Sequence, residues 1–155
     1  MKLSKNFALS EITHSNTAKR LGIDNTPNEK HLANMSLLIN NLIQPMRDSI
    51  GPIRISSGYR GKDLNRAIGG SRKSQHCKGQ ALDIQFWQNG KMMNELIYEW
   101  VLDSGLEFDQ MINEFDFAWI HISLKEKDNR KQVLEAYKNK DGDTAYKVAD
   151  TSTAI

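Results

Sequence analysis

The chain has little cysteine, little proline and no long apolar segment. Cys77 is the only cysteine among 155 residues, so an intramolecular disulfide is excluded and the sequence suits a reducing compartment. No run of about eighteen apolar residues occurs, and the N-terminal segment has no apolar run of signal-peptide length. We therefore expect a protein that does not insert into a membrane and is made in the cytoplasm without a signal peptide.

An excess of one charge is also absent. The 21 lysines and arginines oppose 19 acids, which gives a formal net charge of +2, and the basic residues are scattered along the sequence. Because nucleic-acid binding usually needs a clustered basic surface, we expect no nucleic-acid partner. The length suits one compact domain with a core of its own. We expect a monomer with a single domain over residues 1–149 and a loose tail over residues 150–155.

Two segments have the apolar spacing of amphipathic helices. Residues 26–51 carry such a stripe, begin with Thr26 and Glu29 at capping-box spacing, and contain Pro45, which is expected to kink the helix. Residues 92–104 repeat apolar side chains every three to four positions and predict a second long helix. Shorter helices are expected within residues 9–22 and 62–70.

A period of two indicates the strands. Residues 80–86 form a strand in which the apolar side chains share one face, so Asp83 points to the other. Residues 108–115 and 118–124 alternate around a turn at Asp116 and Phe117, which predicts an antiparallel hairpin. Further strands are expected after residue 52 and in a hairpin that turns at residues 141–142. Helices and mostly antiparallel strands in separate blocks predict an α+β domain, with a small sheet packed against helices.

The first hairpin places an acid near a histidine. With Asp116 and Phe117 as its loop, Glu114 pairs with Trp119 and lies diagonal to His121 on the same face of the sheet. Such diagonal neighbours are about 7 to 8 Å apart in typical sheets. The prediction therefore depends on the register of this hairpin.

Three side chains in these segments suit a metal ion. His76 begins the turn before the strand that carries Asp83, and His121 lies on a strand of the hairpin. Two imidazoles and one carboxylate suit tetrahedral zinc with an open fourth position, as in catalytic sites. A histidine and an aspartate at this spacing are also common by chance, so a polar loop histidine and a strand-edge aspartate remain the alternative.

Three motifs carry a resemblance. The segments SSGYR (residues 56–60), SQHCKGQALDI (residues 74–84) and WIHIS (residues 119–123) occur in an order that resembles the M15 family of zinc peptidases, the D-alanyl-D-alanine carboxypeptidase-like group. The helices before these motifs resemble the phage and prophage branch, so the resemblance covers about residues 6–138. It implies the Hedgehog/DD-peptidase fold.

The resemblance also implies roles for single residues. It implies zinc on His76, Asp83 and His121, with Arg60 and Ser74 near the substrate's carboxylate or the developing oxyanion. Hydrolysis further needs a base and an acid.

The catalytic carboxylate departs from the family pattern. Many members carry it three positions before the last histidine, where this chain has Ala118. We favour Glu114 as the catalytic group because strand alternation aims it at His121. Asp116 in the turn is the alternative, and a site that has lost its base is a third reading.

The function expected from this resemblance is zinc-dependent hydrolysis of an amide bond in the peptide stems of bacterial peptidoglycan. The enzyme is expected to serve in phage lysis or as part of a virion, reaching the cell wall after release from the host cytoplasm. The alternative is a zinc-binding but non-hydrolytic module of the same fold, either cell-wall-binding or structural in a virion.

Overall fold

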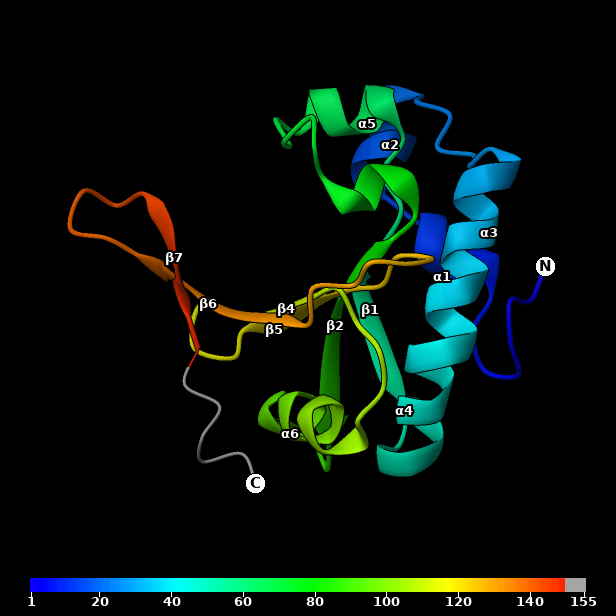
Figure 1. Cartoon of the computed structure of the whole chain (residues 1–155). Helices are drawn as coiled ribbons and strands as arrows, with labels where there is room; N and C mark the ends of the chain where they lie inside the picture. The colour runs from blue at the N-terminus through cyan, green and yellow to red at the C-terminus, as the bar shows by residue number, and fades with distance from the viewer. Residues whose placement is uncertain (150–155) are drawn as a thin grey trace.

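The computed structural model describes residues 1–149, and the predicted loose tail lies outside this range. A seven-stranded sheet has the order β1-β2-β5-β4-β6-β7, with β3 paired to β2 (Figure 1). Within the described residues, β4 and β6 run parallel and the other pairs are antiparallel. The strands are β1 Ile53–Ser57, β2 Ala81–Gln88, β3 Lys91–Met92, β4 Gln110–Glu114, β5 Trp119–Ser123, β6 Gln132–Lys138 and β7 Thr144–Val148. This mixed, mostly antiparallel sheet with helices confirms the α+β prediction.

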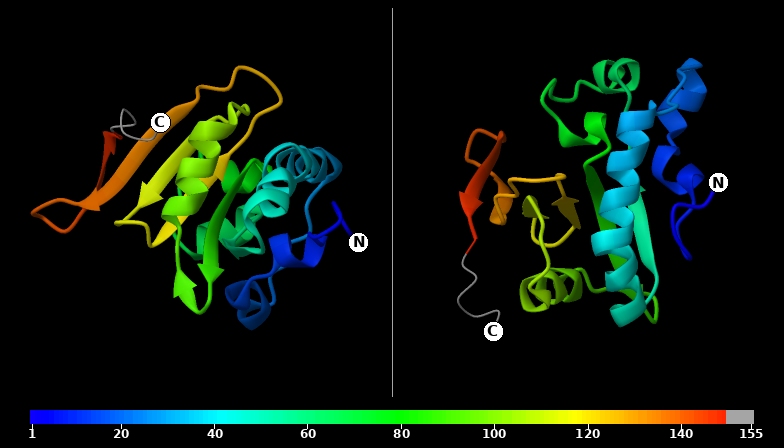
Figure 2. Two further views of the ribbon diagram at one scale, coloured as in Figure 1. Left: turned by 90° about the horizontal axis from the view of Figure 1, so that it is seen from below. Right: turned by 45° about the vertical axis from the view of Figure 1, so that its right-hand side comes forward.

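The long helical segments lie alongside the sheet. Figure 2 shows α3 and α4 as one continuous column, with α6 below the central strands in the view of Figure 1. The helices are α1 Leu9–Thr13, α2 Asn16–Leu21, α3 Glu29–Leu38, the π-helix η1 Ile39–Ile43, α4 Gln44–Ile50, α5 Lys62–Ala67, the 3₁₀-helix η2 Gln75–Lys78 and α6 Glu95–Ser104.

The core lies between these helices and one face of the sheet. Leu82 and Ile84 of β2 and Ile122 of β5 are fully buried with Leu42 of η1 and Ile97 of α6 in one cluster. Since side chains alternate along a strand, residues between these positions face the other side of the sheet. Asp83 and His121 lie on that opposite face, as predicted.

The first long helix begins differently from the prediction. Asn28, not Thr26, caps α3: its side chain accepts a hydrogen bond from the backbone N–H of His31. The Thr26 hydroxyl instead donates to Asp24. The helix also continues past Pro45, immediately after the π-helical turn of η1. A π-helical turn shifts the register of the backbone hydrogen bonds just before Pro45, which has no N–H to donate.

The second long helix begins at Glu95 rather than Met92, which corrects the prediction. Asn89 and Gly90 both have positive φ, 53° and 77°, so the chain turns back after β2. Met92 in β3 therefore pairs with Trp87 in β2. Asn-Gly is the usual signal for such a tight hairpin. The helical spacing of the two methionines concealed this turn.

The hairpin register is confirmed. β4 and β5 pair Glu114 with Trp119 and Ile112 with His121, so Glu114 is diagonal to His121 on one face. The connection is longer than two residues: it includes Phe115, and Ala118 N–H donates to the carbonyl of Glu114. The predicted terminal hairpin is also present as β6 and β7. Its parallel pairing to β4 was not predicted.

Candidate metal and catalytic site

The three candidate metal ligands meet on the open face of the sheet. Asp83 and His121 are directly opposite each other in β2 and β5. Oδ1 of Asp83 lies 3.1 Å from Nδ1 of His121 and 3.3 Å from Nε2 of His76. One ligand atom from each residue lies within 4.8 Å of the other two. The fold therefore brings together side chains from η2, β2 and β5.

The donor set fits a zinc ion. Zinc bonds of about 2.0 to 2.1 Å in a tetrahedron separate ligand atoms by about 3.4 Å. The spacing of Asp83 from both histidines is close to this value. Burial alone would raise the pKa of Asp83, but hydrogen bonds with His121 and His76 outweigh it and hold the pKa well below its usual range. An ionised carboxylate between two imidazoles is what a divalent cation needs.

The orientation of His76 is fixed by the backbone. Its Nδ1 lies 2.8 Å from the carbonyl oxygen of Gly58, so Nδ1–H donates there and Nε2 faces Asp83. Such a second partner for a ligating histidine sets its tautomer. Gly58 itself has no room for a side chain, because a Cβ would lie 2.1 Å from the carbonyl oxygen of Ile12. The close approach of β1 to α1 thus positions the carbonyl that holds His76.

A carboxylate lies in the same cavity. The cavity has a volume of about 590 Å³, and its lining includes the three candidate ligands and Glu114. Burial, and then the charge of Asp83, raise the pKa of Glu114. Asp116, the alternative acid, is exposed in the turn and is not among the lining residues. Of these two acids, Glu114 is therefore the one that lines the cavity with the candidate ligands.

Two predicted substrate residues, Arg60 and Ser74, also line the cavity. Arg60 Nη2 donates to the Ser74 hydroxyl at 3.2 Å, and both residues belong to the lining. Arg60 Nε is buried and has no hydrogen-bond partner among the described residues. A guanidinium with a buried and unused donor suits an anionic or carbonyl group of a ligand.

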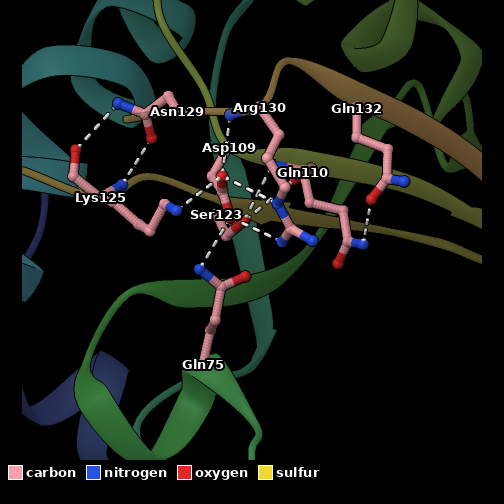
Figure 3. A network of polar contacts seen from close by, with 8 residues as sticks. All are labelled: Gln75, Asp109, Gln110, Ser123, Lys125, Asn129, Arg130 and Gln132. Carbon is pink, nitrogen blue, oxygen red and sulfur yellow. Dashed lines mark hydrogen bonds and ion pairs between the residues drawn. The ribbon is translucent and has the colours of Figure 1, made fainter. Parts of the chain in front are cut away.

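A buried aspartate that the sequence analysis missed supports the site. Asp109 is fully buried and accepts hydrogen bonds from Gln75, next to His76, and from Arg130 (Figure 3). Burial alone would raise the pKa of Asp109, but the hydrogen bonds of Arg130 outweigh it and hold the pKa at about 2. Lys125 lies 3.5 Å from the same carboxylate. This network joins η2 to the start of β4.

The turn beside Glu114 is fixed by a second missed residue, Asn94. Its buried side-chain amide donates to the carbonyls of Phe117 and Ala118, at 2.8 and 3.2 Å. Gln85 also donates to Ala118. Neither Asn94 nor Asp109 belongs to a motif, and only a tertiary structure could show that they connect distant segments.

Residues 5–123 match the family Peptidase M15, so the chain belongs to this family of metallopeptidases. The matched range ends at Ser123 and includes all three candidate metal ligands. No curated protein matches the sequence. Among the described residues, no helix is both long enough and apolar enough to cross a membrane.

Proposed function

We propose that this chain hydrolyses an amide bond in the peptide stems of bacterial peptidoglycan with the help of zinc. The observation that carries the proposal is the convergence of His76, Asp83 and His121 with Glu114 in one cavity of a peptidase M15 chain. We further propose that it acts as a monomer in phage lysis or as part of a virion. Either role would bring a protein made in the host cytoplasm to the cell wall.

The chemistry divides between the metal and the protein. Zinc, when held by His76, Asp83 and His121, lowers the pKa of water towards 7 and polarises a carbonyl group. Glu114 takes the proton of the attacking water and delivers it to the leaving amine. Its raised pKa suits a group that must both accept and release a proton.

Arg60 supplies positive charge to the cavity. Arg60 directs its guanidinium to the cavity beside Ser74, where it offsets charge on the substrate's carboxylate or on the developing oxyanion. Peptidoglycan stems carry free carboxylates, so such a group favours their binding. Ser74 also caps η2, because its hydroxyl accepts from the backbone N–H of His76.

One observation favours a second candidate, a zinc-binding module without hydrolytic activity. Ala118 occupies the position where the resemblance leads us to expect an acid, and its carbonyl holds Gln85 and Asn94 in structural hydrogen bonds. If Glu114 does not serve as the base, the same fold would bind zinc and cell wall without cutting it.

Analysis of digested peptidoglycan tests both candidates. Purified protein loaded with zinc is incubated with isolated cell walls, and the released fragments are identified by mass spectrometry. We expect new free amino and carboxyl termini within the stem peptides, and the fragment masses will identify the bond. Sedimentation of the protein with intact walls, without any new termini, would favour the non-hydrolytic module.

A further inference from the structure

A second cavity lies beside the candidate metal site and is bordered by positive charge. Its volume is about 980 Å³, and its lining includes Lys62, Arg66, Arg72 and Lys78. No acidic side chain is among the lining residues within the described part of the chain. Each of these four cations is exposed, and none forms an ion pair with an acid of residues 1–149.

The charge is local to one stretch of the chain. Residues 60–78 contain six lysines and arginines but one acid, Asp63, whereas the whole chain has a net charge of only +2. Asp63 does not line the cavity. The fold places four of these basic residues, from α5, the following loop and η2, around one cavity. Such clustering creates a field that attracts anions.

One loop separates this basic cavity from the metal site. Gly70 and Arg72 line the basic cavity, whereas Ser71 and Lys73 line the metal site. Asn65 fixes the loop, because its side-chain Nδ2 donates to the backbone carbonyl of Ser71 and its backbone carbonyl accepts from Gly70 N–H. Gly70 packs so closely that a Cβ would lie 2.0 Å from Asn65 Oδ1. A ligand in the basic cavity would thus be separated from the metal site only by this loop.

We propose that the basic cavity binds a polyol phosphate, a polymer in which phosphodiesters alternate with hydroxyl-bearing units. Two guanidinium groups, Arg66 and Arg72, favour phosphate because they can hold it with paired hydrogen bonds. Four cations around a cavity far larger than one phosphate suit several phosphates in sequence. Asn28 adds a neutral polar group to the lining that can meet a hydroxyl.

Nucleic acid fits the cavity less well. Proteins that hold single strands stack the bases on exposed aromatic rings. Among the described residues that line the cavity, Tyr59 is the only aromatic one other than histidine; it is 6% exposed and has its hydroxyl 3.0 Å from Nδ1 of His31. A polyol phosphate needs no stacking surface.

The biological use of this cavity rests on the proposed function, but phosphate binding does not. A polymer attached to the cell wall would hold the enzyme so that peptide stems enter the neighbouring metal site. The effective concentration of stems at the site would rise accordingly. Binding and hydrolysis can be measured separately, so the two proposals fail separately.

Titration calorimetry with the full chain tests the inference at low salt. The probes are poly(glycerol phosphate) of about ten units, glycerol 3-phosphate and inorganic phosphate. We expect the polymer to bind at least tenfold more tightly than either small anion, because several phosphates engage at once. Its affinity should fall with added salt. The double variant Lys62→Gln/Arg66→Gln should lower the affinity about tenfold or more.

A matched pair of variants controls for net charge. Arg54→Gln/Lys91→Gln removes one arginine and one lysine that are exposed on β1 and β3 and line neither cavity. Equal losses in the two double variants would overturn the proposal, as would the absence of polymer binding. Equal affinity for polymer and glycerol 3-phosphate would point to a free phosphate compound instead. Tighter binding of a single-stranded oligonucleotide of equal charge would assign the cavity to nucleic acid.

Discussion

Asp83 and His121 are direct partners across β2 and β5, and their side chains touch on the face of the sheet that the core helices leave open. His76 reaches the same carboxylate from η2. We predict that His76→Ala or His121→Ala lowers zinc affinity by at least about 100-fold. This exceeds the loss typical when a residue that only hydrogen-bonds a metal ligand is replaced. Metal analysis after dialysis against a competing chelator measures this. The control is His14→Ala, which is exposed and outside the site. A variant that retains zinc with the wild-type affinity would show that the other two residues suffice.

Gly58 is predicted to act on the metal through His76. In Gly58→Ala, the new Cβ would lie 2.1 Å from the carbonyl oxygen of Ile12, so the β1 segment must shift together with the carbonyl that holds His76 Nδ1. We expect zinc affinity to fall about 10- to 100-fold. Gly61→Ala is the control, since its Cβ would meet only ordinary contacts at 3.4 Å or more. If both variants bind zinc equally well, this close approach does not position His76.

Sequence patterns are informative on the strands around the candidate site. The facing of Asp83 and the register that pairs Glu114 with Trp119 follow from the period of two, because one face of each strand must be apolar. Glu114 and His121 could therefore be placed on one face of the hairpin, and Asp83 on the face of its strand away from the core. The Asn89-Gly90 turn was missed because the methionines after it continue the helical spacing.

Interactions between distant segments could not be predicted in this way. Asp109 bonds Gln75 and Arg130, which are separated from it by 34 and 21 positions. Nothing in the sequence around Asp109 marks it as fully buried. The basic cavity is a similar case, since its lining depends on how α5 and η2 pack around one loop.

Metal removal is predicted to leave the domain folded. The core of helices and sheet contains fully buried side chains such as Leu42, Ile84 and Ile97, and it lies on the face opposite the metal site. Zinc should therefore add stability only through binding to the native state. Circular dichroism after chelation should keep its helical signal, while the melting temperature falls and recovers when zinc is restored. Loss of the helical signal on chelation would mean that the metal is structural.

The stability contributed by Asp109 should depend on pH. Its pKa is lowered from 3.8 to about 2 in the folded chain, so its contribution is fully present above about pH 4 and is lost as the pH falls through about 2. This shift corresponds to about 2 kcal/mol of unfolding free energy at neutral pH. Asp109→Asn should destabilise the metal-free protein by about that amount at pH 7. The difference from wild type should nearly vanish near pH 2.

Denaturant unfolding at the two pH values measures this difference, with Glu107→Gln as control. Glu107 is 66% exposed and pairs with Lys131 at 3.7 Å, so its loss should cost less than about 1 kcal/mol at either pH. An Asp109→Asn effect that is the same at pH 7 and pH 2 would mean that packing, not charge, is what the carboxylate provides.

Glu114 and Asp116 can be separated as catalytic groups by isosteric substitution. Glu114 lies in the cavity with the three candidate metal ligands, whereas Asp116 is exposed in the turn and has φ of 57°. Glu114→Gln keeps the shape but removes the proton acceptor, so turnover on peptidoglycan should fall by about 10² or more while zinc remains bound. Asp116→Asn is the matched control and should retain most of the activity. Release of stem-peptide termini and zinc content are measured on the same samples. The reverse result would make Asp116 the base and require the turn to fold back over the metal, and full activity in both variants would remove this hairpin from the chemistry.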